Sequence, residues 1–269
     1  MRKTCALCKL NTDLKESHFI PAALYRLISK ENIKDGFSPD HISVSPAGTM
    51  QTSRQITCKL LCGNCEQQFS ERGEKIIINE CFRGESNFLL REKLRRQTPT
   101  WSDQSRSLFA ATSMQHINVD AYRYFAASIF WRGSSGHWTA PGHNEWRGSL
   151  GLRYEEEFRR FLLDEIPFPQ QALLAFFIAN EEKPLGYSSV TSKHRNHGFH
   201  THKFHIPGIE VRMFLGSKID RNISFLFDEW STNSIFFLED SRANGSFAQI
   251  VNMAHTTPVR GKLRERTLL

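Results

Sequence analysis

The residue types with the clearest chemistry are two pairs of cysteines, each with two residues between its members. Cys5 and Cys8 form the first pair, and Cys62 and Cys65 form the second. Four thiolates from two such C-x2-C knuckles can complete a tetrahedral Zn²⁺ site that clamps distant chain segments together. The spacing therefore predicts a structural zinc ion on these four cysteines, against the alternative that one knuckle is accidental.

Two further cysteines lie close to the knuckles. Cys58 is four residues before Cys62 and could replace one ligand. Cys81 is interpreted as a small buried apolar side chain, as free cysteines commonly are. Disulfides are not expected, because cysteines inside the cell are mostly thiols or metal ligands.

The segment between the knuckles carries a family resemblance. It contains SHFIP at 17–21, and the second knuckle stands within LLCGNCE at 60–66. With the first knuckle, these segments resemble HNH nucleases, also called ββα-metal nucleases, over about the first 80 residues. In that family a C-x2-C knuckle precedes a [D/E/S]-H-x-I-P segment, and a second knuckle opens the helix that carries a metal ligand. The resemblance implies a zinc-stabilised ββα-metal fold.

The resemblance also implies roles for individual residues. His18 matches the family's general base, and Glu66 occupies the place where many members carry a metal-binding His or Asn. Glu66 would then hold a catalytic Mg²⁺ or Mn²⁺, separate from the zinc. Ser17 stands where an Asp often adds a ligand, and no Asn occurs at 55–57. These departures motivate the alternative of a scaffold that does not cleave.

Phosphodiester hydrolysis gives independent reasons for these residue types. A water must lose a proton, which histidine accepts near neutral pH, and a carboxylate-bound cation can stabilise the departing oxygen. Taken alone, His18 would be read as a hydrogen-bonded loop residue and Glu66 as a carboxylate that complements a helix dipole. Glu74 is interpreted as a solvated helix residue rather than a functional one.

The elements that would position these residues follow from apolar periodicity and turn residues. In the first region we expect a strand ending near Phe19, a helix at 22–31, a polar loop to about 53 and a helix at 66–80. Asp120 is the expected N-cap of a helix at 121–131. The remaining expected elements are a helix at 154–165, strands at 172–178, 203–215, 222–227 and 234–238, and a helix at 245–254.

The predicted fold class is α+β, divided near residue 100. Residues 1–100 would form the zinc-stabilised ββα-metal (HNH) region, and residues 101–269 an α+β region with an antiparallel sheet for substrate selection or assembly. A basic stretch at 91–100, which contains a proline, separates them. Its run from Arg91 to Arg96 is interpreted as a charged linker or a nucleic-acid contact.

A second cluster of candidate residues lies at 193–205, where five of the 11 histidines fall within 12 residues. His200 and His202 would share one face of a strand, so metal binding is one interpretation. A basic loop that contacts phosphates and a solvated loop are the others. Trp131 and Arg132 are interpreted as core packing, with base stacking and a phosphate contact as the alternative.

Composition restricts the partners and the compartment. Lys and Arg number 35 against 28 Asp and Glu, and the net charge of +7 favours a polyanion such as nucleic acid. No apolar run reaches the roughly 18 residues of a membrane span, and no secretory signal is visible. We expect a cytoplasmic protein without a membrane partner. The sequence contains no phosphate-loop, serine-hydrolase or dinucleotide motif.

The favoured hypothesis is a metal-dependent HNH-type endonuclease that hydrolyses nucleic-acid phosphodiester bonds, with DNA favoured over RNA. The resemblance further implies a component of a bacterial or phage defence system. A protein partner or a homo-oligomer is a separate expectation. The alternative is a non-catalytic, zinc-stabilised module that binds nucleic acid or protein. The two hypotheses differ in whether His18 and Glu66 converge on a shared water or metal.

Overall fold

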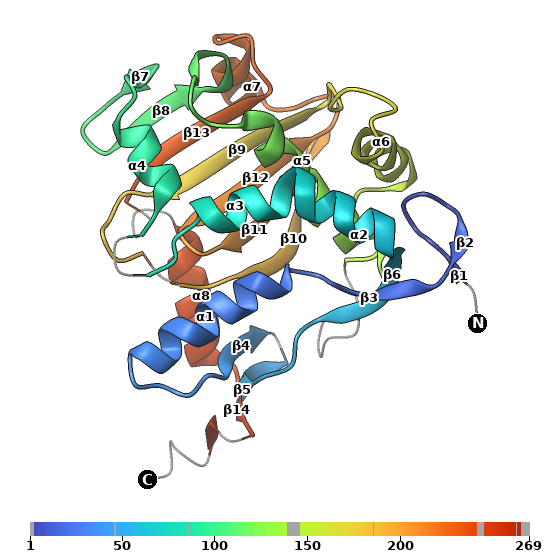
Figure 1. The fold of residues 1–269 in the computed structure, drawn as a ribbon. Coiled ribbons are helices and arrows are strands. Elements are labelled where there is room, and N and C mark those ends of the chain that lie inside the picture. Colours follow the sequence, from blue (N-terminus) through green and yellow to red (C-terminus); the bar gives the residue numbers. More distant parts are fainter. Residues whose placement is uncertain are drawn as a thin grey trace.

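Helices and strands are mixed along the whole chain. The computed structural model describes residues 3–45, 47–84, 87–138, 146–184, 186–240, 245–261 and 263–264. The largest sheet in this part is mostly antiparallel, which confirms the predicted α+β class. Figure 1 shows helices packed against that sheet and a smaller group of elements below it. No helix among the described residues has the length and apolar character needed to cross a membrane.

The segments with the candidate catalytic residues form two paired strands followed by a helix. Strand β3 (Leu14–His18) pairs antiparallel with β6 (Thr57–Cys62), and α2 (Gly63–Phe69) starts directly after β6. The short strands β1 (Lys3–Thr4) and β2 (Asn11–Thr12) pair on either side of the first knuckle. Strand β3 confirms the strand predicted here, whereas β6 was not predicted.

The helix predicted at 66–80 is confirmed, with an earlier start and an irregular turn. It runs from α2 through the π-helical turn Ser70–Glu74 into α3 (Lys75–Glu80). Gly73 lies in this turn, and a Cβ built there would stand 3.1 Å from the backbone of Phe125. Glycine therefore permits a second helix to pack closely at this turn. Such π-turns are frequent at functional sites.

A small layer combines segments from both ends of the chain. Helix α1 is longer than predicted and is followed by the antiparallel hairpin β4–β5. Strand β14, near the C-terminus, pairs parallel with β5, and α8 contacts β4. The polar loop predicted up to residue 53 is therefore wrong, because a partner strand from the far end of the chain helps to order it. The bounds are Ala22–Lys34 for α1, His41–Ser45 for β4, Gly48–Thr52 for β5, Gly245–Thr256 for α8 and Val259–Arg260 for β14.

Seven strands of the described chain form the large sheet, in the order β10-β11-β12-β9-β13-β8-β7. Neighbours are antiparallel except β9 and β13, which are parallel. These two central strands confirm the strands predicted at 172–178 and 234–238. The bounds are Trp101–Ser102 for β7, Arg106–Ala110 for β8, Ala172–Ala179 for β9, Ser189–Asn196 for β10, Phe199–Ile206 for β11, Ile209–Leu215 for β12 and Ser234–Glu239 for β13.

Helices cover both faces of the central strands, which explains why these strands are apolar throughout. On one face, Tyr122 of α5 (Val119–Ser135) packs against Phe176 and Phe236. On the other face, α7 (Arg221–Asp228) packs against a separate apolar cluster. The strand predicted at 222–227 is therefore wrong. An aspartate at the N-cap of α7 accepts a backbone N–H, and a short apolar run can form either element.

Other predicted helices need smaller corrections. Asn118, not Asp120, caps α5, and its side chain accepts the N–H of Ala121 at 3.0 Å. The helix predicted at 154–165 is α6 (Leu152–Leu162), and the helix predicted at 245–254 is α8. A 3₁₀ turn at Ala111–Ser113 precedes α5.

The basic stretch near residue 100 is not a linker. Its first half is helix α4 (Leu89–Arg95), in which Arg91 is buried and donates to the carbonyl of Glu181. Arg91 therefore cannot contact nucleic acid. One hydrophobic core contains residues from both sides of the predicted boundary, such as Leu94 and Phe125. The division at residue 100 into two folding units stays a prediction.

The histidine-rich stretch forms the hairpin of β10 and β11, so a solvated loop is the wrong interpretation. The strand predicted at 203–215 is likewise two strands, β11 and β12. His200 and His202 lie on one strand with ring centroids 6.3 Å apart, but no third ligand joins them among the described residues. His205 is buried, and its Nε2 lies 2.6 Å from a carboxylate oxygen of Glu210.

We predict that Glu210 makes the fold acid-sensitive. Burial opposes its charged form, but the hydrogen bond from His205 and the charge of Arg212 lower its pKa to about 2. A carboxyl whose pKa is lowered on folding stabilises the fold above its unfolded pKa, and this contribution is lost as the pH falls toward the folded pKa. Glu210→Gln should therefore destabilise the protein most near neutral pH, and the difference should shrink between pH 4.5 and pH 2.

Denaturant unfolding at several pH values measures this difference. Glu229→Gln, at an exposed carboxylate, is the control and should leave the pH dependence unchanged. A Glu210→Gln effect that is the same at every pH would contradict the assignment.

Candidate metal centre and adjoining pocket

The four predicted ligand cysteines meet in one cluster. The sulfur atoms of Cys5, Cys8, Cys62 and Cys65 all lie within 4.8 Å of one another, and those of Cys8 and Cys62 are 3.8 Å apart. A tetrahedral site with Zn–S bonds of about 2.3 Å places its sulfurs about 3.8 Å apart. The cluster can therefore bind a metal ion such as zinc. It is the one group of three or more metal-ligating side chains found among the described residues.

Backbone contacts hold the two knuckles together around this cluster. The N–H of Ala6 donates to the carbonyl of Leu60 at 3.0 Å, and the N–H of Cys62 donates to the sulfur of Cys5 at 3.3 Å. A hydrogen bond from Cys65 lowers the pKa of the Cys5 thiol to about 4. The same contact raises the pKa of the Cys65 thiol, so this pair favours one thiolate, the form in which cysteine binds metals.

The two remaining cysteines lie outside the cluster. Cys58 is on β6 opposite Ser17, and burial raises its pKa to about 11. The alternative in which Cys58 replaces a ligand is therefore wrong. Cys81 is fully buried, and burial raises its pKa to about 12, which confirms the interpretation as a small apolar side chain.

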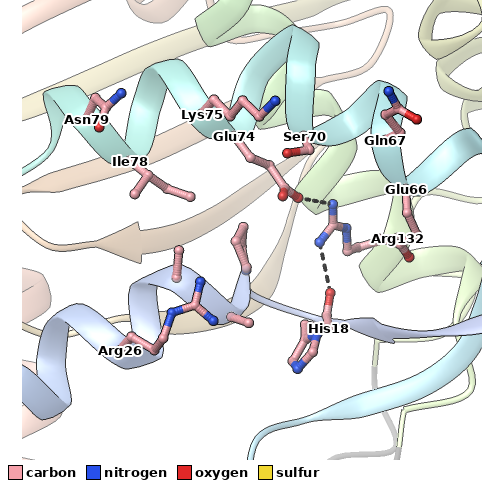
Figure 2. A pocket seen from close by; sticks show the side chains of 13 residues that line it. His18, Arg26, Glu66, Gln67, Ser70, Glu74, Lys75, Ile78, Asn79 and Arg132 are labelled. Carbon is pink, nitrogen blue, oxygen red and sulfur yellow. Dashed lines mark hydrogen bonds and ion pairs between the residues drawn. The ribbon is translucent and has the colours of Figure 1, made fainter. Parts of the chain in front are cut away.

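His18 and Glu66 line one pocket of about 620 Å³. His18 ends β3, and Glu66 follows Cys65 in α2, so each comes from an element that also touches the cysteine cluster. Figure 2 shows both side chains at this pocket, between α1 and the helix that contains the π-turn. Both are half-buried. The pocket brings the two predicted catalytic residues together, whereas their roles stay predictions.

Ser17 fixes the position of Glu66. Its side chain is buried, its hydroxyl donates to Oε1 of Glu66, and its oxygen accepts the N–H of Leu61 at 3.2 Å. The residue that departs from the family pattern is therefore joined to the predicted metal ligand. This contact ties the carboxylate to strands β3 and β6.

Arg132 lines the pocket although it comes from α5 of the second region. Its guanidinium donates to the carbonyl of His18 at 2.8 Å and to Oε1 of Glu74 at 2.6 Å. Its side chain is 3% exposed, which confirms the core-packing interpretation of this residue. The interpretation of Glu74 as a solvated helix residue is wrong, because its carboxylate pairs with this buried cation.

Two exposed cations and several polar side chains complete the pocket. Arg26 comes from α1 and Lys75 from α3, and Figure 2 shows them on opposite walls. Gln67, Ser70 and Asn79 add amide and hydroxyl groups. Sequence reasoning missed Arg26 and Lys75, because an isolated basic residue on a helix is an ordinary surface feature. The pocket thus combines an imidazole, carboxylates and cations, which are groups that could contact a phosphate-containing ligand.

Comparison of the chain with protein-family models, with curated proteins and with solved structures finds no match.

We predict about one tightly bound zinc per chain, because four sulfurs at tetrahedral spacing favour it. Cys62→Ser should lose this zinc. Removing a closed metal site costs several kcal/mol, and each kcal/mol lowers the Tm of a chain this size by roughly 2–4 °C, so the Tm should fall on the order of 10 °C. Elemental analysis and thermal unfolding provide the two measurements.

Cys58→Ala is the matched control, because Cys58 lies on the same strand but outside the cluster. It should keep the zinc and most of the stability. Freshly purified, folded protein without zinc, or a Cys62→Ser variant as stable as wild type, would refute the prediction.

Proposed function

We propose that this chain is a metal-dependent HNH-type endonuclease that hydrolyses nucleic-acid phosphodiester bonds. The observation that carries the proposal is the shared pocket of His18 and Glu66 beside the four-cysteine cluster. The two residues are 48 positions apart in sequence, yet both line this pocket, which supports the interpretation of the SHFIP and LLCGNCE motifs. A random pair of surface residues would have no reason to do so.

The local chain order supports a ββα-metal arrangement. Strands β3 and β6 pair antiparallel, α2 follows directly, and the second knuckle spans the start of that helix. In this arrangement β3 supplies the base and α2 supplies the metal ligand. The zinc would clamp the two strands and take no part in the chemistry.

His18 would take the proton from the attacking water, since an imidazole is suited to this near neutral pH. Glu66 would hold the divalent cation, supported by Ser17 and by nearby hydroxyl and amide groups that suit hard cations. When bound, Mg²⁺ or Mn²⁺ supplies charge stabilisation for the departing oxygen.

The charges around the pocket favour a nucleic acid as the substrate. Arg26 and Lys75 can contact phosphates on either side of the scissile bond, and the net charge of +7 attracts a polyanion. We favour DNA over RNA as the substrate, and the sequence resemblance suggests a role in bacterial or phage defence. Cytoplasmic action belongs to the proposal because the sequence shows no secretory signal and no apolar run as long as a membrane span. A protein partner or a homo-oligomer belongs to the same proposal.

One observation favours the alternative of a non-catalytic binding module. The hydroxyl of Ser17 already occupies one oxygen of Glu66, and the same serine accepts a backbone N–H. Glu66 would then serve to join β3 and α2 rather than to hold a cation. The two functions differ in what removal of each side chain does to cleavage.

We predict that His18→Ala abolishes cleavage while zinc content and folding stay close to wild type. A general base contributes about 10²- to 10⁴-fold to the rate. Glu66→Gln should instead raise the Mg²⁺ or Mn²⁺ concentration required for activity, because this residue would act through the cation. The assay uses plasmid, single-stranded DNA and tRNA with either metal.

Matched controls are His116→Ala, at an exposed histidine that does not line the pocket, and Glu71→Gln, at an exposed carboxylate on the same continuous helix as Glu66. Both should cleave like wild type. A wild-type rate in His18→Ala would overturn the catalytic assignment, and a wild type that is inert on every substrate would favour the binding module.

We also predict that nucleic-acid binding weakens steeply with salt. Affinity that depends on a few phosphate contacts should fall at least about tenfold between 50 mM and 200 mM salt. Arg26→Ala, which removes a cation from the pocket wall, should reduce the slope of log affinity against log salt by about 1. Lys30→Ala, on the same helix but outside the pocket, should leave the slope near wild type. A flat salt dependence would point to an uncharged partner.

A further inference from the structure

The guanidinium of Arg132 is a buried link between the two walls of the pocket. It donates to the backbone carbonyl of His18 on one wall and to the carboxylate of Glu74 on the other. It also lies over the ring of Phe69, 5.1 Å from the centroid. Figure 2 shows Arg132 between these two acceptors. The end of β3 is thereby tied to the π-turn.

Two glycines let α5 come close enough to make this link. A Cβ at Gly73 would lie 3.1 Å from Phe125 of α5, and a Cβ at Gly133, next to Arg132, would lie 2.9 Å from the ring of Phe19. Phe19 directly follows His18. Helix α5 is therefore packed against both walls of the pocket, and this packing fixes the position of the Arg132 guanidinium between them.

Stability alone does not account for this arrangement. Replacing a buried ion pair by less polar side chains of similar volume is often neutral or stabilising. The Nε of Arg132 is buried and has no hydrogen-bond partner, so the guanidinium is not fully satisfied. The contact of Arg132 has a geometric effect instead. It holds the backbone carbonyl of His18, whose side chain is the predicted base.

We propose that Arg132 is a positioning residue that orients His18 through its backbone carbonyl, with Glu74 holding the guanidinium in place. This inference rests on the proposed function for its effect on cleavage. It also means that the second region completes the active pocket, in addition to any role in substrate selection. Displacing the base would lower the cleavage rate, because reacting groups must be held in a narrow range of geometries.

The chain contains a matched control for this link. Arg91 is equally buried, pairs with Glu92 at 3.0 Å and donates to the backbone carbonyl of Glu181. It lies in α4 and does not line the pocket. Each of these two arginines therefore ties two segments together, but of the two only Arg132 contacts His18.

Cleavage kinetics provide the first test. Arg132→Met with Glu74→Gln removes both charges together, so no unpaired buried ion remains to unfold the chain. We expect kcat to fall on the order of 10²-fold with KM nearly unchanged. Arg132→Lys, which keeps the charge but loses the two-pronged donor, should fall between wild type and this double variant. Arg91→Met with Glu92→Gln should cleave like wild type. Wild-type kcat in the Arg132 double variant, or an equal loss in the Arg91 double variant, would overturn the proposal.

The second test does not depend on cleavage. Histidine-selective NMR reports the ring signals, and His18→Gln identifies the signal of His18. The Arg132 double variant should shift or broaden this signal, whereas the Arg91 double variant should leave it unchanged. An unaltered His18 signal would overturn the positioning role even for an active enzyme. A wild type that cleaves nothing would refute the proposed function, while the NMR result still decides whether Arg132 orients His18.

Discussion

The four-cysteine cluster is the contact on which the position of the pocket depends. It joins segments 57 residues apart in sequence and lies at the end of the β3–β6 pairing where Leu14 is opposite Cys62. Cys65 and Glu66 are consecutive in α2, so their side chains point about 100° apart around the helix. One side chain faces the cluster and the other faces the pocket. The position of the carboxylate thus follows from the position of the sulfur.

Helix α5 provides the second constraint. It lies in the common core, packs against the central strands of the large sheet and closely approaches both the π-turn and Phe19. Its polar contribution comes from Arg132 at its C-terminal end, where the helix reaches the pocket. The large sheet therefore influences the site through one rigid helix. A boundary near residue 100 separates sequence features but not the residues that build the pocket.

Sequence reasoning succeeded where a few residue types at fixed spacing define a structure. The four cysteines were predicted to meet because two C-x2-C knuckles together supply the four thiolates of a tetrahedral zinc site, and they do meet. Sequence reasoning failed where the structure depends on pairing between segments that are distant in sequence. The β4–β5 hairpin is extended by β14 from the other end of the chain, and no local periodicity reveals that partner. Arg132 contacts Glu74 and His18, which are 58 and 114 positions away in sequence. The sequence alone therefore could not distinguish a positioning role for Arg132 from simple core packing.

The electrostatic environments of the two carboxylates beside the pocket distinguish their roles. Glu74 is paired with the buried guanidinium of Arg132, so its charge is already compensated. Glu66 receives a neutral hydroxyl from Ser17, which orients the carboxylate without cancelling its charge. A divalent cation gains more from an uncompensated carboxylate than from one already paired with a cation. Two acids eight residues apart on one continuous helix thus have different environments. Glu74 holds the arginine that contacts the end of β3, whereas the carboxylate of Glu66 suits the metal-binding role proposed for it.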